Sequence, residues 1–186
     1  MKSAKGGGAA DMNNMMPKGM TLKVQGAKMI TLVEGGMADG MEMLYAEGQA
    51  PVRINRQNKT YSTMPEGSTG SAPEVNVTRA PQTMTILGYN CQKYLVEVKS
   101  EGQSMNQIMW TTTDIKDMDM KALSRQRSAQ GQPMFTDKVQ GVPLRVEVSA
   151  PQGTMVMEVK EIKREKLNEA DFKIPAGFKE TKFSPY

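Results

Sequence analysis

The sequence predicts a mostly β protein of the α+β class, built on an antiparallel sheet with one or two short helices. Apolar and polar residues alternate with period two in many segments, as they do in strands that bury one face. Long apolar runs separated by full helices, which a parallel doubly wound sheet requires, do not occur. The composition is 38% hydrophobic but only 5% aromatic, and 18 of the 186 residues are methionine. The core is therefore expected to be aliphatic, with flexible thioether side chains filling it.

The length of 186 residues fits one domain. Residues 1–19 are rich in Gly, Ala, Asn and Met without any period, so we expect a flexible arm or a long loop there. Residues 20–186 are then expected to form a single antiparallel β domain. Its first half holds five strand candidates, the last two of which would form a hairpin: residues 20–25, 28–33, 41–45, 52–54 and 59–64.

The middle of the chain is expected to be a long connection. Residues 65–82 contain several turn-forming residues, namely Pro65, Gly67, Gly70, Pro73 and Pro81. Alternation resumes beyond this connection and is cleaner than in the first half. It predicts four further strands, at residues 94–99, 108–111, 144–149 and 154–160.

One amphipathic helix is expected between these later strands. Thr113 or Asp114 can cap its first turn, and Gly131 with Pro133 would end it. A second helix of a single turn is expected over residues 168–172, ahead of Pro175.

The composition excludes several classes of function. The net charge is only +4, from 24 basic and 20 acidic residues, so no nucleic-acid partner is expected. There is no histidine, which removes the commonest general base and the commonest metal ligand. Cys91 is the single cysteine, so neither an internal disulfide nor a Cys-rich zinc site can form. No nucleophile–base motif or phosphate-binding loop is present. We therefore predict that the protein is not an enzyme and has no cofactor.

Methionine clustering raises one metal hypothesis. Met12, Met15, Met16 and Met20 lie close together in and beside the expected arm, where a packed core does not explain them. Thioether sulfurs are ligands that select Cu(I), so a Cu(I) site is a third and minor alternative. The methionines elsewhere are more simply explained as core residues.

Three segments carry a resemblance to a known family. They are residues 86–94 (ILGYNCQKY), residues 108–112 (IMWTT) and residues 167–178 (LNEADFKIPAGF). In this order and spacing they resemble a family of uncharacterised exported bacterial proteins, classified as a domain of unknown function, over residues 20–179. That family is similar in fold to the lipoprotein carriers LolA and LolB, whose curved antiparallel sheet forms a half-barrel over an apolar cavity.

The resemblance implies a LolA-like half-barrel and a periplasmic or otherwise extracytoplasmic location. A signal peptide, and any lipid anchor that attaches the protein to a membrane surface, would lie outside this chain. No catalytic residue carries over from the family. The family also leads us to expect an N-terminal strand where this chain has its Gly-rich arm. Without that strand one sheet edge is open, and a second copy of the chain would be able to pair with it as a homodimer.

The leading hypothesis is a non-catalytic extracytoplasmic binding domain that holds a hydrophobic small molecule, lipid or acyl chain on the concave face of its sheet. The alternative is a structural or interaction protein with a filled core, acting through a sheet edge or through the N-terminal arm. An enclosed cavity would distinguish the two. The apolar face expected to bind the ligand comprises Tyr94, Val96, Ile108, Trp110, Leu144, Val146, Met155 and Met157.

Overall fold

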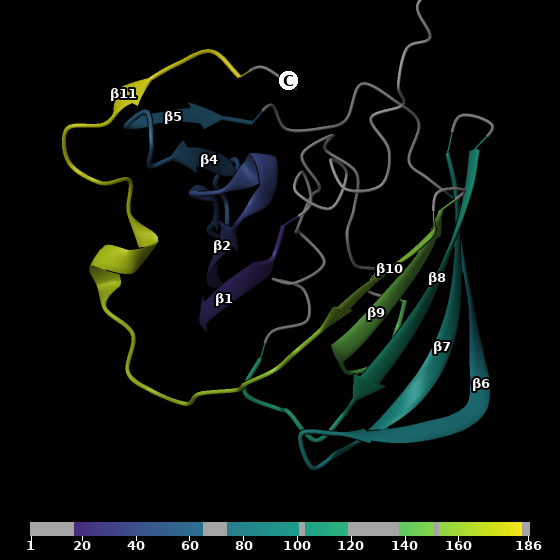
Figure 1. Ribbon diagram of the computed structural model, residues 1–186. Helices are drawn as coiled ribbons and strands as arrows, with labels where there is room; N and C mark the ends of the chain where they lie inside the picture. The colour runs from purple at the N-terminus through teal and green to yellow at the C-terminus, as the bar shows by residue number, and fades with distance from the viewer. Residues whose placement is uncertain (1–16, 65–73, 101–102, 119–137, 151–152, 184–186) are drawn as a thin grey trace, which may run out of the picture. The chain divides into compact units, whose positions relative to one another are not determined.

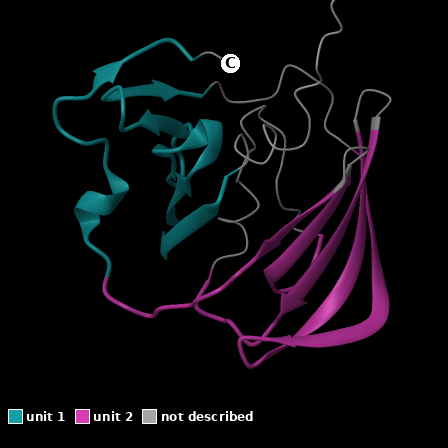
Figure 2. Cartoon of the chain, viewed as in Figure 1, with its two compact units in different colours: residues 1–66, 167–186 teal, residues 67–166 magenta. Residues whose placement is uncertain are grey.

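The chain folds into two compact units, each built on its own sheet (Figures 1 and 2). Unit 1 comprises residues 1–66 and 167–186, and unit 2 comprises residues 67–166. The chain therefore leaves unit 1 to form unit 2 and then returns to complete unit 1. The computed structural model describes residues 17–64, 74–100, 103–118, 138–150 and 153–183.

Unit 1 contains a sheet of six strands in the order β1-β2-β3-β4-β5-β11. Strands β1 to β5 form an antiparallel meander, whereas the short β11 pairs parallel with β5. The alternation in the sequence produces this meander, because each predicted strand pairs with the next along the chain. The bounds are β1 Gly19–Gln25, β2 Lys28–Glu34, β3 Met41–Tyr45, β4 Val52–Asn55, β5 Thr60–Thr63 and β11 Lys179–Glu180.

The C-terminal segment is attached to the sheet of unit 1 by a short helix. This 3-10 helix, η2 (Glu169–Phe172), begins where the Asn168 side chain accepts a hydrogen bond from the Ala170 N–H. Phe172 at its end is buried. Asp171 pairs with Lys23 of β1 at 2.9 Å. The single-turn helix expected at residues 168–172 is thus confirmed.

A buried carboxylate lies within the same sheet. Glu42 of β3 sits between Leu32 of β2 and Ile54 of β4, and its side chain is only 3% exposed. The Arg56 guanidinium donates a short hydrogen bond from Nε to Glu42 Oε1. This bond raises the pKa of Arg56 above its ordinary value. The second carboxylate oxygen, Oε2, has no hydrogen-bond partner among the described residues.

Unit 2 contains an antiparallel sheet of five strands in the order β10-β9-β8-β7-β6. Figure 1 shows that its long strands twist and that β6 bends sharply along its length. Two breaks in register accompany this curvature, one between β6 and β7 and one between β8 and β9. The bounds are β6 Glu74–Ile86, β7 Tyr89–Ser100, β8 Gln103–Thr112, β9 Val142–Ala150 and β10 Gly153–Glu158.

The expectation of a long connection at residues 65–82 is wrong for its second half, because β6 begins at Glu74. Residues 65–73 lie outside the described part. Pro81 was one of the residues that indicated a connection, since proline is rare inside strands. Here it falls on an edge strand, at the register shift between Arg79 and Thr83, where a missing N–H costs no ladder hydrogen bond. Within this bulge, the Gln92 side-chain amide donates to the carbonyls of Ala80 and Gln82, on either side of Pro81.

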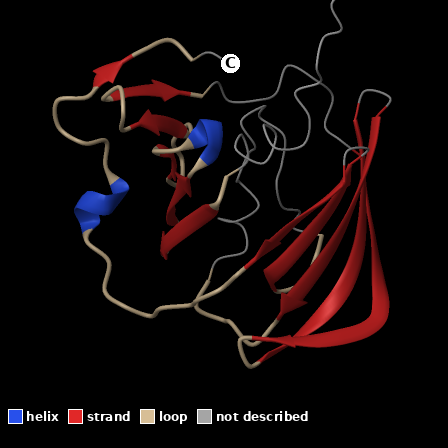
Figure 3. Cartoon of the chain, viewed as in Figure 1, coloured by secondary structure: helices blue, strands red, loops and turns tan. Residues whose placement is uncertain are grey.

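The larger predicted helix is not found where it can be checked. Residues 113–118 contain bends and no helical turn, and residues 119–137 lie outside the described part. The Asp114 N–H instead bonds Thr112 Oγ1 at 3.2 Å. The described residues contain two helices, the 3-10 helices η1 (Gly36–Ala38) and η2, which are drawn in blue in Figure 3. Neither of these two is long or apolar enough to cross a membrane.

The mostly β class with few short helices is confirmed. The two sheets of the described residues are largely antiparallel, and neither closes into a barrel. The arm expected at residues 1–19 falls almost wholly outside the described part, and its last residue, Gly19, is the first residue of β1.

Candidate functional site

The sheet of unit 2 has two faces of different character. One face, here called the core face, carries the buried cluster of Tyr94, Val96, Met109 and Val146. The register brings these side chains together, because Tyr94 pairs with Met109 and Met109 with Val146. Val139, which precedes β9, packs into the same cluster. The core face is therefore a small hydrophobic core rather than a bare surface.

The predicted ligand face is split between the two sides of this sheet. By register, the core face carries five of the eight residues, namely Tyr94, Val96, Val146, Met155 and Met157. Leu144 lies at the break in register between β8 and β9 and is buried. Ile108 and Trp110 lie on the opposite face, because their partners on β7 are Leu95 and Lys93.

The opposite face, here called the charged face, is organised around Trp110. The Lys93 ammonium lies 5.5 Å from the centre of the Trp110 ring, within cation–π range. The indole N–H donates to Glu147 Oε1 at 3.2 Å. Arg145 then links Glu147 at 2.8 Å to Glu158 at 2.6 Å. Trp110 is thus packed and hydrogen-bonded, which argues against a role in lining an open ligand site.

The ion pairs of the charged face predict how stability changes with pH. Arg145 lowers the pKa of Glu147, and Lys160 and Arg145 together lower the pKa of Glu158. In the folded protein the pKa values of both carboxyl groups lie below the value of about 4.3 that a glutamate has in the unfolded chain. The stabilisation by these ion pairs is therefore complete above about pH 4.3. This stabilisation is lost as the pH falls through the pKa values that Glu147 and Glu158 have in the folded protein. We expect Arg145→Gln to flatten the decline of stability between about pH 5 and pH 2.

Urea unfolding at a series of pH values checks this prediction. Trp110 is the only tryptophan of the chain and lies in unit 2, so its fluorescence reports on this sheet. Arg79→Gln is the control, because Arg79 bonds the neutral Gln92 side chain at 3.0 Å. The prediction would be contradicted if the free energy of unfolding of Arg145→Gln fell with pH as steeply as that of the wild type.

The segment that leads into β9 is fixed against the core face by several contacts. Thr111 Oγ1 donates to the Gln140 carbonyl at 2.6 Å, and Lys138 Nζ donates to the Val75 carbonyl at 2.9 Å. Gly141 has φ of +86°, and a Cβ built there would lie 2.4 Å from the Thr112 carbonyl oxygen. Only glycine permits this approach. Residues 138–141 are thereby held in a defined position over the sheet.

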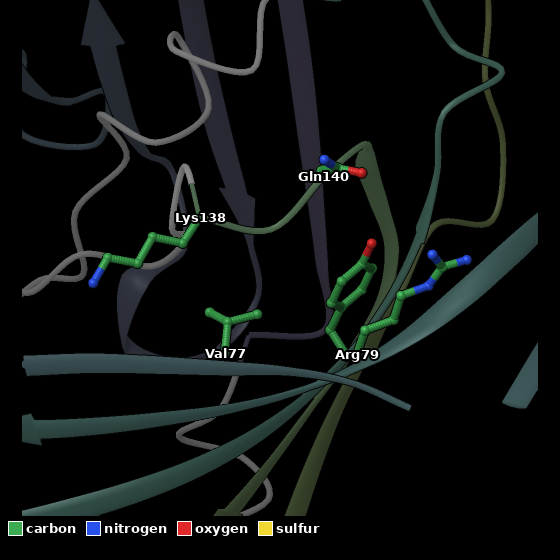
Figure 4. Close-up of a pocket in the computed structure, with 5 residues that line it drawn as sticks. Val77, Arg79, Lys138 and Gln140 are labelled. Atoms are coloured by element: carbon green, nitrogen blue, oxygen red, sulfur yellow. The ribbon is translucent and has the colours of Figure 1, made fainter. Parts of the chain in front are cut away.

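An open groove of about 480 Å³ lies where this segment meets β6 and β7 (Figure 4). Val77 and Arg79 of β6 reach it from the core face, because they pair with Val96 and Tyr94 of β7. Figure 4 shows Arg79 and Lys138 on either side of Val77, with their charged ends directed apart. The groove is lined by Val77, Arg79, Tyr94, Lys138 and Gln140.

The lining of the groove combines an apolar floor with a cationic rim. Val77 and the ring of Tyr94 supply apolar surface, and none of the lining residues that the structure describes is a carboxylate. The Arg79 guanidinium donates to the Gln92 side chain, and the Lys138 ammonium donates to the Val75 carbonyl. A guanidinium has five N–H donors, so Arg79 retains donors for a ligand, and Lys138 adds positive charge to the rim. The arrangement suits an amphiphile with an apolar body and an anionic group.

The sequence pattern did not identify four of the five residues that line the groove. Val77 and Arg79 fell within the supposed connection, although Val75 and Val77 alternate with polar neighbours and this signal was available. Lys138 and Gln140 belong to no periodic segment, and only tertiary structure brings them to β6.

The described residues offer no metal centre and no reactive thiol. They contain no group of three or more His, Cys, Asp or Glu residues placed to hold a metal ion. Of the four methionines of the Cu(I) hypothesis, Met20 lies in β1 and is 43% exposed, whereas Met12, Met15 and Met16 lie outside the described part. Cys91 is fully buried, and its burial raises the pKa of the thiol. Cys91 therefore remains a protonated packing residue.

Comparison with known proteins identifies a family but no characterised relative. The family model described as Domain of unknown function (DUF4412) matches residues 7–178, which is most of the chain. No curated protein and no solved structure matches the chain significantly.

Proposed function

Because the chain belongs to the DUF4412 family, whose function is unknown, we propose a role from the candidate site: a non-catalytic extracytoplasmic domain that binds a small anionic amphiphile. The observation that carries this proposal is the groove over β6 and β7, with its apolar floor and cationic rim. A LolA-like carrier role, in which the ligand is a lipid or acyl chain, is part of the same proposal.

The size of the groove supports this role. A volume of about 480 Å³ falls within the range of roughly 300–1,000 Å³ typical of small-molecule sites. The groove is open rather than enclosed, so part of a bound ligand would stay in contact with water. A molecule with a polar end tolerates that exposure better than a purely apolar one. We therefore expect amphiphiles rather than neutral hydrocarbons as ligands.

The chemistry of the rim determines which end group is preferred. Arg79 is exposed and presents a planar guanidinium, which matches carboxylate, sulfonate or phosphate oxygens. Tyr94 and Val77 would contact the apolar part of the same ligand. Among the five described residues of the lining, no negative side chain opposes an anion. Arg79 would therefore select ligands by charge, and the apolar floor of Val77 and Tyr94 would select them by shape.

Two fluorescent probes of similar shape test the proposal. Anilinonaphthalene sulfonate carries an anionic group, whereas N-phenylnaphthylamine has similar rings and no charge. We expect wild-type protein to bind the anionic probe more tightly. Arg79→Gln should weaken binding of the anionic probe about five- to tenfold, which corresponds to about 1 kcal/mol for one hydrogen bond in a groove open to water, and leave the neutral probe unchanged. Val77→Asp should weaken binding of both probes.

Lys93→Gln is the matched control for these titrations. It removes the same unit of charge from β7, but Lys93 lies on the charged face over Trp110. If Lys93→Gln and Arg79→Gln lost the same affinity for the anionic probe, the effect would come from net charge, and the groove would not be the binding site. Absence of saturable binding to folded wild-type protein would reject it as well.

A further inference from the structure

The outer edge of β10 presents unpaired backbone groups. On its inner side β10 pairs with β9, and the Val159 N–H continues this ladder by donating to the Leu144 carbonyl at 2.8 Å. In an antiparallel ladder, the N–H and C=O of successive residues point alternately inward and outward. Met155 and Met157 therefore direct their backbone groups toward β9, and Thr154, Val156 and Glu158 direct theirs outward. No hydrogen bond from another described residue reaches this outer side.

This edge lacks most of the features that protect strand edges from association, and its one charged residue, Glu158, is already paired with Arg145 and Lys160. Its six residues include no proline, lysine or arginine, and no register shift interrupts its pairing with β9. The opposite edge of the same sheet, β6, carries Pro81 and a bulge. In addition, β10 exposes apolar side chains on both faces of the sheet. Met155 is 38% exposed on the core face, and Val156 is 46% exposed on the charged face.

We propose that β10 pairs antiparallel with β10 of a second copy of this chain, about a twofold axis through Val156. This register places Val156 opposite its own copy and Met155 opposite Met157 of the second copy. Thr154 then lies opposite Glu158, so no two like charges face each other. All three residues with outward backbone groups fall in hydrogen-bonded pairs, which form about six new hydrogen bonds. The two five-stranded sheets would join into one continuous sheet.

The interface defined by this pairing is small. One six-residue edge buries less surface than the roughly 1,200–2,000 Å² of a standard stable interface. We therefore expect a weak, reversible dimer, with a dissociation constant on the order of 10–100 µM. This inference is independent of the proposed ligand, because the groove lies over β6 and β7 at the far side of the sheet.

Sedimentation equilibrium of the full chain, up to about 500 µM, tests the proposal. Wild-type protein is expected to show a monomer–dimer equilibrium. Val156→Lys places two ammonium groups opposite each other and should raise the dissociation constant at least about tenfold. Val156→Pro removes only an outward N–H, which an edge strand tolerates, and should weaken the dimer while β9–β10 pairing persists.

Leu95→Lys is the matched control. Leu95 is 43% exposed on the same charged face, close to the 46% of Val156, but its strand β7 is paired on both sides. The Leu95→Lys protein should dimerise like the wild type. A wild-type protein that stays monomeric over the whole concentration range would overturn the proposal. Dimerisation of a folded Val156→Lys protein with unchanged affinity would overturn it too.

Discussion

Replacing Gly141 by alanine should lower the free energy of unfolding of unit 2 by about 2–4 kcal/mol. Two effects add at this position. The backbone has φ of +86°, which costs a residue with a Cβ on the order of 1 kcal/mol or more. The new Cβ would also lie 2.4 Å from the carbonyl oxygen of Thr112, which belongs to a strand and cannot move freely. Either β8 or the segment at residues 138–141 must shift.

Gly88→Ala separates these two effects. Gly88 has a similar φ of +81°, but nothing lies within 4 Å of the position its Cβ would take. Alanine there should cost on the order of 1 kcal/mol, the conformational part alone. Urea unfolding followed by Trp110 fluorescence measures both variants. A Gly141→Ala protein no less stable than Gly88→Ala would show that the contact with Thr112 is not a close one.

The same Gly141 variant connects stability to the groove. Lys138 and Gln140 reach the groove only because their segment is held over the core face. A shift of this segment should therefore weaken binding of the anionic probe under conditions where the protein is still folded. We expect Gly88→Ala, at the β6–β7 turn, to bind the probe like the wild type.

Alternation predicted the strands well because period two is a local property of the sequence. The hairpin formed by β4 and β5, and the strands β7 to β10, follow from it directly. Which side chains of a strand face the core is not determined by the local sequence. In β8 the apolar residues Ile108, Met109 and Trp110 are consecutive, so alternation cannot say which of them faces the core. The pairing of Met109 with Tyr94 settles this, and a shift of one residue would reverse it.

The groove was predictable only in part. Tyr94 was named because it belongs to a clear alternating strand, and it does line the groove. Val77 was not predicted to lie in a strand, because Pro81, four residues later, was among the residues that suggested a connection. The bulge that accommodates Pro81 depends on Gln92 of the neighbouring strand, which no reading of residues 74–86 alone can supply. Lys138 and Gln140 depend on contacts with β6 and β8 that are distant in sequence.

Removing the guanidinium of Arg56 should destabilise unit 1 by about 2–4 kcal/mol at neutral pH. The Arg56 side chain is 53% exposed, so losing its own packing contacts should lower the free energy of unfolding only slightly. The cost arises at Glu42, whose carboxylate is 3% exposed and would be left without its cation. Glu42 Oε2 already lacks a partner among the described residues, so no second bond compensates. Urea unfolding followed by circular dichroism, with hydrogen exchange at β3 and β4, measures the loss in Arg56→Ala.

Neutralising the carboxylate distinguishes a buried charge from lost packing. Glu42→Gln has nearly the same shape without the charge, so Arg56→Ala combined with Glu42→Gln should recover most of the stability that Arg56→Ala loses. Lys28→Ala is the control for a surface ion pair in the same unit. Lys28 and Glu169 are 3.5 Å apart and well exposed, so this change should have little effect. If the double variant were as unstable as Arg56→Ala, the aliphatic stem of Arg56, and not the buried charge, would be what stabilises the sheet at β3.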